Sequence, residues 1–330
     1  MTALLRGARL AALLFGGVFA TAALPPAEAQ ELQAGKPIRL IVGLSPGGGT
    51  DVTARLIAQQ MTANTGMTVL VENKAGGNFI PALMEVARAA PDGHTIYFSS
   101  TSSLITQALN PDYPYDLRKF TAISEVATGP LILVVRNDLG VKSVKDLIAL
   151  AKQKPGSVRF GLGGGIGSSL GVSTALLQTL ADIKINMVPY RGAAPALNDL
   201  LGGHIDAMID AMPVMSVQAK EGKVTPLAVT GTKRSTLLPD VPTMQESGFP
   251  TFVVTGWYGM FAPPGTPPSI AQKLRDEAAK AIGPAEVVKT LASQGMEPRG
   301  TQPAEYAKYM EEEFAFYSKI IKDADIKPPQ

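Results

Sequence analysis

The chain has 330 residues, of which 45% are hydrophobic and 18% are charged, so it can bury the cores of two ordinary domains and is not a disordered protein. It contains no cysteine, which excludes disulfides, thiolate metal sites and a lipid attached to a cysteine. Its formal net charge of +2 at pH 7 gives no reason to expect nucleic acid or an anionic membrane as a partner.

Residues 1–29 are predicted to be a secretory signal peptide. Arg6 and Arg9 stand at the start of the apolar stretch "LAALLFGGVFATAAL", and Ala27 and Ala29 form a small-x-small cleavage site. The apolar stretch has about 15 residues, fewer than the roughly 20 of a bilayer span, although a membrane anchor is the alternative. The pattern predicts cleavage and release into the periplasm.

Along the rest of the chain, short runs rich in valine and isoleucine alternate with longer stretches of helical period, as in α/β proteins with mostly parallel sheets. Strands are predicted at 38–43, 67–73, 95–100, 131–136, 158–163, 185–190, 207–212 and 225–231. Helices are predicted at 52–64, 79–90, 102–109, 143–154, 168–181, 193–203 and 214–221, with two more beginning at Pro268 and near Pro303. Because the strands are apolar without alternation, we expect helices on both faces of each sheet.

The order of these elements predicts two lobes, each with its own sheet. An irregular stretch separates the first β-α-β-α-β unit from the second, and the proline-rich segment after the second unit has no complete sheet. We therefore expect a discontinuous first domain, 30–128 with 232–330, and a second domain, 129–231. The chain would cross between the lobes near 126–130 and 231–252, forming a hinge beside a ligand cleft.

The stretch "SPGGGTD" (45–51) places a glycine run between a predicted strand and a helix. Such a corner can hold an anion, because glycine lets the backbone approach closely and the first helical turn has unpaired N–H groups; a turn without a ligand would have the same composition. Four more loops are rich in Gly, Ser, Thr or Asn: "NKAGGN" (73–78), "SSTSS" (99–103), "GGGIGSS" (163–169) and "PYRGAAP" (189–195). Since ligands of open α/β sheets lie beyond the carboxyl ends of the strands, the five loops together predict a pocket of neutral donors around a carboxylate.

Several residues near these loops allow two interpretations. Asp51 is expected to cap its helix rather than to contact an anion, which it would repel. Arg191 would either bind the ligand or brace its lobe through a salt bridge. Asp210 would either accept a hydrogen bond from an amino, hydroxyl or protonated group of the ligand or cap a turn. Trp257 and Tyr258 are expected to form part of the wall where the lobes meet.

Motifs for catalysis are weak. "GSSLG" (167–171) matches G-x-S-x-G with Ser169 as nucleophile, but the one histidine that follows it, His204, is predicted in a surface turn. The chain has no Walker pattern and no dinucleotide fingerprint, and two scattered histidines cannot build a typical metal site. Binding without catalysis, cofactor or metal is therefore predicted, and an exported serine hydrolase that uses Ser169 is the alternative.

The motifs "RLIVGLSPGGGTDVTARLIAQQM", "VENKAGGNFI", "APDGHTI", "GGIGSS", "VPYRGAAPALNDLLGGHIDAMID" and "GWYGMFAPPGTPPSIAQKL" follow one another in this chain. In order and spacing over residues 36–320, they resemble the tripartite tricarboxylate transporter substrate-receptor family, the Bug-type periplasmic solute-binding proteins. The resemblance implies two α/β lobes of the type II-like periplasmic binding protein fold, which close over a small mono-, di- or tricarboxylic or aromatic acid. It also implies these ligand-binding residues: Ser45, Pro46, Gly47, Gly48, Asp51, Asn78, Thr101, Ser102, Gly165, Ile166, Gly167, Ser168, Tyr190, Gly192 and Asp210.

The resemblance also implies partners. A receptor of this family would present its carboxylate to the permease subunits of a tripartite transporter, or to a sensor, and we expect it to be a monomer. Gly171 and Ala175 stand where many members have His and Glu, so the resemblance does not identify the acid.

Overall fold

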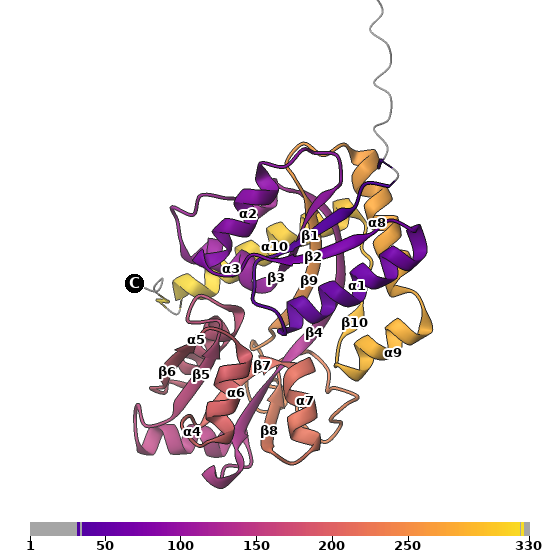
Figure 1. The fold of residues 1–330 in the computed structure, drawn as a ribbon. Helices are drawn as coiled ribbons and strands as arrows, with labels where there is room; N and C mark the ends of the chain where they lie inside the picture. The colour runs from indigo at the N-terminus through magenta and orange to yellow at the C-terminus, as the bar shows by residue number, and fades with distance from the viewer. Residues whose placement is uncertain (1–31, 34, 324, 327–330) are drawn as a thin grey trace, which may run out of the picture.

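The computed structural model describes residues 32–33, 35–323 and 325–326. The predicted signal peptide, residues 1–29, lies outside the described residues. None of the helices in the described residues has both the length and the hydrophobicity that crossing a bilayer requires. The chain folds into two lobes of strands and helices, one above the other in Figure 1. The predicted α/β class is therefore confirmed.

The first lobe contains the N-terminal strands and the C-terminal helices. Its strands are β1 (Ile38–Val42), β2 (Val69–Asn73), β3 (Thr95–Ser100), β9 (Thr255–Ala262), the two-residue β10 (Glu297–Pro298) and the first part of β4 (Thr121–Arg136). Its helices are α1 (Gly49–Thr65), α2 (Ile80–Ala87), α3 (Thr101–Leu109), α8 (Pro268–Ile282), α9 (Ala285–Ser293) and α10 (Pro303–Asp323). The strand order is β2-β1-β3-β9-β4; β1, β2 and β3 are parallel, whereas β9 is antiparallel to both its neighbours.

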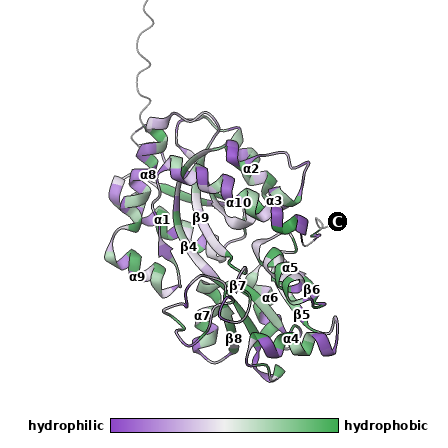
Figure 2. Cartoon of the chain, turned by 180° about the vertical axis from the view of Figure 1, so that it is seen from behind, coloured by the Kyte–Doolittle hydropathy of each residue, from purple (hydrophilic) through white to green (hydrophobic). Residues whose placement is uncertain are grey.

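Both faces of this sheet are buried. In β1, Leu40 and Val42 pack in one core cluster with Ile57 of α1, while Ile41 lies in another cluster with Leu83 of α2. All five side chains are at most 1% exposed. The expectation from non-alternating strands therefore holds, because helices cover each side. Figure 2 shows the hydrophilic colour mostly on outer helices such as α2 and α8.

The second lobe contains the middle of the chain. Its strands are β5 (Arg159–Gly163), β6 (Asn186–Tyr190), β7 (Ala207–Ala211), β8 (Val224–Val229) and the end of β4. Its helices are α4 (Val144–Gln153), α5 (Ser169–Ala181), α6 (Ala193–Leu201) and α7 (Met212–Lys220). The strands follow the order β4-β7-β5-β6, with β8 also paired to β4. The outer pairs β5–β6 and β5–β7 are parallel as predicted, while β4 is antiparallel to β7 and β8.

The strand β4 runs through both lobes, which sequence analysis did not foresee. Its first part pairs with β9 and its second part with β7 and β8, so the strands form one continuous sheet instead of two. The prediction of an irregular stretch was wrong for residues 121–130. Register shifts between Ala122 and Ser124 and between Glu125 and Ala127 remove the alternation by which a strand is recognised. The predicted domain boundaries stay a prediction.

The chain returns to the first lobe beside β4. The main-chain N–H of Leu131 donates to the Thr230 hydroxyl at 2.8 Å, and the N–H of Val254 donates to the carbonyl of Thr230 at 3.1 Å. Thr230 therefore joins the two segments that connect the lobes.

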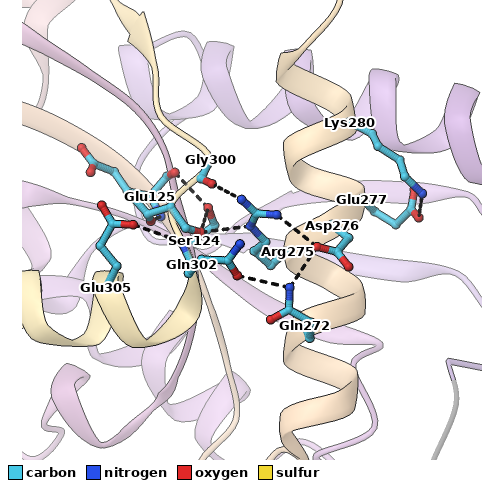
Figure 3. A network of polar contacts seen from close by, with 11 residues as sticks. Ser124, Glu125, Gln272, Arg275, Asp276, Glu277, Lys280, Gly300, Gln302 and Glu305 are labelled. Carbon is cyan, nitrogen blue, oxygen red and sulfur yellow. Dashed lines mark hydrogen bonds and ion pairs between the residues drawn. The ribbon is translucent and has the colours of Figure 1, made fainter.

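A network of hydrogen bonds fastens the residues just before α10 to β4 and α8 (Figure 3). The guanidinium of Arg275 on α8 donates to the carbonyl oxygens of Gly300 at 2.6 Å and Thr301 at 3.3 Å. The Ser124 hydroxyl on β4 donates to the same Thr301 carbonyl at 2.9 Å. The C-terminal segment is thereby fastened to the strand that connects the lobes.

Candidate ligand-binding site

A cleft of about 440 Å³ lies between the two lobes. The first lobe lines it with residues 44–50, 100–102, 256–258 and 296, β4 with 129–131, and the second lobe with 163–164, 169–170, 191–195, 197, 210–211 and 214. Residues of both lobes therefore face one volume, as the hinge prediction requires.

A larger hollow of about 650 Å³ lies on the first lobe alone, beside α2. Apart from Arg88, its charged side chains form ion pairs: Arg39 pairs with Glu85 and with the neighbouring Glu72, Lys74 pairs with Glu85 at 3.3 Å, and Lys36 pairs with Asp92 at 2.6 Å. We place the candidate site in the interlobe cleft instead, because two lobes can close on a ligand there and its charges are not paired.

Several helices begin at this cleft. The first turns of α1, α3, α5, α6 and α7 all contribute lining residues. The N-cap residues Gly48, Ser100, Gly192 and Ala211, all in the described part of the chain, make no side-chain capping hydrogen bond. First-turn N–H groups and the positive ends of these helix dipoles are therefore available to an anion.

The two N-cap glycines keep these helix ends open. Gly48 has φ −82°, and the atom nearest to an added Cβ would be the Ser45 carbonyl oxygen at 4.0 Å. Gly192 has extended φ 175°, and nothing lies within 4 Å of a Cβ there. Neither the backbone conformation nor the packing requires glycine at these positions. Their missing side chains leave room in the cleft.

Gly49 is different, because a Cβ there would lie 2.5 Å from the Tyr258 hydroxyl. Packing therefore requires glycine at this position, and the close approach brings the tyrosine hydroxyl to the start of α1. Trp257 and Tyr258 both line the cleft, in agreement with their predicted place where the lobes meet.

Arg191 and Asp210 are the charged residues of the described lining. The exposed Arg191 forms no ion pair with the described residues, so the salt bridge that sequence analysis considered is not seen. Asp210 is 2% exposed; its Oδ1 accepts from the N–H of Ala211 at 2.7 Å, and its Oδ2 has no partner. Burial raises the pKa of Asp210 to about 7. Burial, and secondarily the Asp210 charge, also raise the pKa of Tyr258.

The structure brings together eight of the fifteen residues that sequence analysis selected. These are Ser45, Pro46, Gly47, Gly48, Thr101, Ser102, Gly192 and Asp210. The other seven lie outside the lining: Asp51, Asn78, Gly165, Ile166, Gly167, Ser168 and Tyr190. Direct contact of any of the fifteen with a ligand stays a prediction.

Asp51 supports the first glycine loop from behind. Its carboxylate accepts from the N–H of Gly47, from Arg55 Nε and from Asn73 Nδ2, each at 3.0 Å. The expected capping role was wrong, because α1 begins at Gly49, three residues before the predicted start, and its N-cap is Gly48; Asp51 lies in the first turn and its carboxylate bonds back to the loop. The carboxylate is therefore occupied by the loop and does not face the cleft.

Three other predicted residues make local contacts. Asn78, in a left-handed conformation with φ 52°, accepts a hydrogen bond from the Tyr113 hydroxyl through its carbonyl. Ser168 caps α5 by accepting from the N–H of Gly171 at 3.2 Å. The Tyr190 hydroxyl donates to Asp199 at 2.6 Å. In the second glycine loop, it is Gly163, Gly164 and Ser169 that reach the cleft.

The lobes also touch through hydroxyl groups at one side of the cleft. The Ser102 and Ser169 hydroxyl oxygens are 3.2 Å apart, and the Thr106 hydroxyl donates to the Gly167 carbonyl at 3.1 Å. Ser169 is thus hydrogen-bonded to another serine. Neither His94 nor His204 belongs to the cleft lining, so the structure does not bring a histidine to the predicted nucleophile.

Sequence reasoning missed the apolar part of the site. Leu131 on β4, Leu170 on α5 and Met296 before β10 line the cleft. The signal in sequence is weak, because apolar residues beside a strand or helix look like ordinary core. Only their position next to the polar loops distinguishes them.

Residues 53–326 match the tripartite tricarboxylate transporter family receptor. The protein BugT of Bordetella pertussis is 35% identical over 315 residues, which cover 94% of this chain and 96% of BugT. A Rhodopseudomonas palustris protein solved with adipate is 33% identical, with a TM-score of 0.82 over 89% of this chain and 98% of that one. MatC of the same organism, with bound malate, is 30% identical, with a TM-score of 0.80 over 86% and 98%.

Proposed function

Because this chain belongs to the tripartite tricarboxylate transporter receptor family, we propose that it captures a small carboxylate in the cleft between its lobes. The observation that carries the proposal is the convergence of uncapped helix N-termini on one cleft. Main-chain N–H groups there can hold a carboxylate by hydrogen bonds and by the helix dipoles. Arg191 adds a cation that no described carboxylate neutralises.

The ligand contributes to closing the lobes. α1 and α3 belong to the first lobe and α5, α6 and α7 to the second, so a bound acid contacts both. A ligand favours the closed state only when it binds that state more tightly than the open one, and contacts from both lobes supply this difference. The Ser102–Ser169 contact lies where the two sets of helix ends meet.

The apolar lining supports a ligand with a hydrocarbon part. Leu44, Leu131, Leu197, Val214 and Trp257 all face the cleft. Such a lining favours an aliphatic chain or an aromatic ring over a compact polyhydroxylated acid, because apolar surface is buried on binding.

The test begins with a thermal-shift screen of carboxylates, since a ligand at 100 times its Kd stabilises the native state by roughly 2.7 kcal/mol. The best acid is then titrated by calorimetry into the Gly48→Ala/Gly192→Ala double variant. We expect the affinity to fall at least about tenfold, roughly 1.4 kcal/mol, with little change in Tm, because the added methyl groups enter the cleft and not the core.

Gly283→Ala is the matched control. Gly283 ends α8, has φ −74°, and its added Cβ would lie 3.5 Å from the nearest atom, so the same chemical change is made outside the cleft. The control should keep wild-type affinity and Tm. Wild-type affinity in the double variant would contradict the proposed site.

We also propose that the protein is exported to the periplasm, cleaved after Ala29, and monomeric. The small-x-small site and the family support this location. Intact-mass measurement of the periplasmic fraction should find a chain that begins at Gln30. Recovery of the uncleaved protein, with residues 1–29, in the membrane fraction would favour the alternative of a membrane anchor.

We propose further that the protein delivers its ligand without chemical change, to permease subunits or to a sensor. The family is one of receptors, which supports this interpretation. The alternative is hydrolysis by Ser169. Ester turnover that disappears in Ser169→Ala would establish the hydrolase, whereas delivery predicts that bound acid is recovered unchanged by mass spectrometry.

A further inference from the structure

The charges of the cleft differ in kind. Arg191 and Asp210 are the charged side chains of the described lining, and its uncharged polar groups include hydroxyls and the main-chain N–H groups of helix starts. Helix N-termini and a guanidinium attract the acceptor oxygens of a carboxylate. Asp210 is therefore the one residue of the described lining whose side chain is a negatively charged hydrogen-bond acceptor when ionised.

Asp210 is held with one oxygen free. Its Oδ1 accepts from the N–H of Ala211 at 2.7 Å, which fixes the carboxyl at the end of β7. Its Oδ2 is buried and has no hydrogen-bond partner. A Cβ at Gly163 would lie 3.0 Å from the Ala193 Cα and 3.2 Å from Oδ2, so glycine at this position lets the start of α6 and the Asp210 carboxyl pack close to β5.

A buried acceptor without a partner is unfavourable unless something else supplies a donor. Ser100, whose hydroxyl is also unpartnered, lines the same cleft. Tyr258 on β9 is the titratable group that interacts with Asp210, and Arg191 is the other charged group of the lining. None of these side chains forms a hydrogen bond with Oδ2.

We propose that the bound acid carries, apart from its carboxylate, a hydroxyl or amino group whose hydrogen bond Asp210 Oδ2 accepts. This inference rests on the proposed function and narrows its ligand class from carboxylates in general to acids with a hydrogen-bond donor. A second ionised carboxylate at this point would face the Asp210 carboxylate and be repelled. Burial raises the pKa of Asp210 to about 7, so the carboxyl is mostly ionised above that pH and Oδ2 can then only accept a hydrogen bond, which is why the test is run at pH 8.

The experiment compares linear acids that differ only at the far end. Calorimetry at pH 8 uses hexanoate, 6-hydroxyhexanoate, 6-aminohexanoate and adipate, and the four-carbon acids with the same four ends. In the wild-type protein, we expect the hydroxy and amino acids to bind at least tenfold more tightly than the parent acid and the diacid.

Asp210→Asn is expected to replace the hydrogen-bond acceptor at the position of Oδ2 by a donor. The amide oxygen is expected to keep the hydrogen bond from Ala211, so the amide NH₂ takes the place of Oδ2 and an acceptor becomes a donor. The amino acids, which can only donate at that end, should lose at least tenfold in affinity. The diacids should gain, and the hydroxy acids, which donate and accept, should change least.

Arg191→Gln is the control within the same lining. It should weaken all the acids by a similar factor and preserve their order, because the guanidinium is placed to attract the carboxylate that they share. Circular dichroism checks that both variants are folded.

The outcomes separate the two proposals. If the wild-type protein does not distinguish the four ends, or if Asp210→Asn leaves their order unchanged, the inference is overturned while carboxylate capture stands. An unchanged order of affinities would mean that water, and not the ligand, donates a hydrogen bond to Oδ2. If none of the eight acids binds, both proposals fail for linear acids.

Discussion

The buried carboxyl of Asp210 should make the stability of the ligand-free protein depend on pH in a way that Asp210→Asn removes. Burial raises the pKa of Asp210 to about 7, whereas an aspartate in an unfolded chain has a pKa of about 4. Between these values, the native protein keeps a proton that the unfolded chain releases. The wild-type protein therefore loses stability from this group as the pH rises from about 4 to about 7, and the loss is complete above pH 7.

The size of the effect follows from the same two values. Each pH unit in that interval contributes about 1.4 kcal/mol, so the upper limit is roughly 4 kcal/mol. The comparison of pH 5 with pH 8 covers two of these three pH units, roughly 2.7 kcal/mol, and water that enters the cleft beside Oδ2 reduces the expected effect to about 1–2 kcal/mol. The amide introduced by Asp210→Asn has no charge to bury, so the variant should be more stable than wild type by this amount at pH 8 relative to pH 5.

The assay is urea denaturation of both proteins at pH 5, 6, 7 and 8, followed by circular dichroism. The difference between the two free energies of unfolding isolates the carboxyl, because all other groups titrate in both proteins. Asp112→Asn, which changes an exposed aspartate in the same way, serves as control. A difference between Asp210→Asn and wild type that does not vary with pH would refute the reasoning.

Three further predictions concern the hinge and the loops. Gly171→Ala would place a Cβ 2.3 Å from a main-chain carbonyl oxygen of the second glycine loop, so we expect a loss of several kcal/mol in urea denaturation, and a loss below about 1 kcal/mol would contradict the packing. Trp257→Phe removes the indole N–H that donates to Glu313 at 3.1 Å, so we expect the free energy of unfolding to fall by about 1–3 kcal/mol. Because burial raises the pKa of Glu313 to about 7, its carboxylate is charged and needs this donor at pH 8 but not at pH 5, and the fall should be greater at pH 8. Equal falls at the two pH values would disprove this. Ser102→Ala removes a hydroxyl that lines the cleft 3.2 Å from the Ser169 hydroxyl, so stability should change by less than about 1 kcal/mol while calorimetry finds weaker ligand binding; unchanged affinity would remove Ser102 from the site.

Local patterns in the sequence were enough to identify most elements and the polar loops. The alternation of apolar runs and helical periods predicted the strands from Ile38 to Val229, apart from the first part of β4, with small shifts at their ends. The glycine run at 47–49 predicted a helix start with open N–H groups, and this helix start lies at the cleft; an open helix N-terminus and missing side chains are local properties. The resemblance in motifs also predicted the family that the comparisons show.

Which residues of each loop face the cleft was decided by the tertiary structure. Sequence reasoning selected residues 165–168, but the turn points Gly163, Gly164 and Ser169 into the cleft, and Ser168 is used to cap α5. The path of β4 through both lobes depends on pairing with β9, which is more than 100 residues away along the chain. Such contacts leave no local period in the sequence.

The sequence by itself determined the α/β class, the neutral donors of the loops and the family resemblance, because these depend on neighbouring residues and on composition. The tertiary structure alone decided that Arg191 has no ion-pair partner among the described residues and that Asp210 Oδ2 is buried without a donor. The physical reason is that burial and pairing are set by segments brought together from distant parts of the chain. The local sequence "MIDAM" would be the same whether the carboxyl of its aspartate faced solvent, formed a salt bridge or lined a cleft.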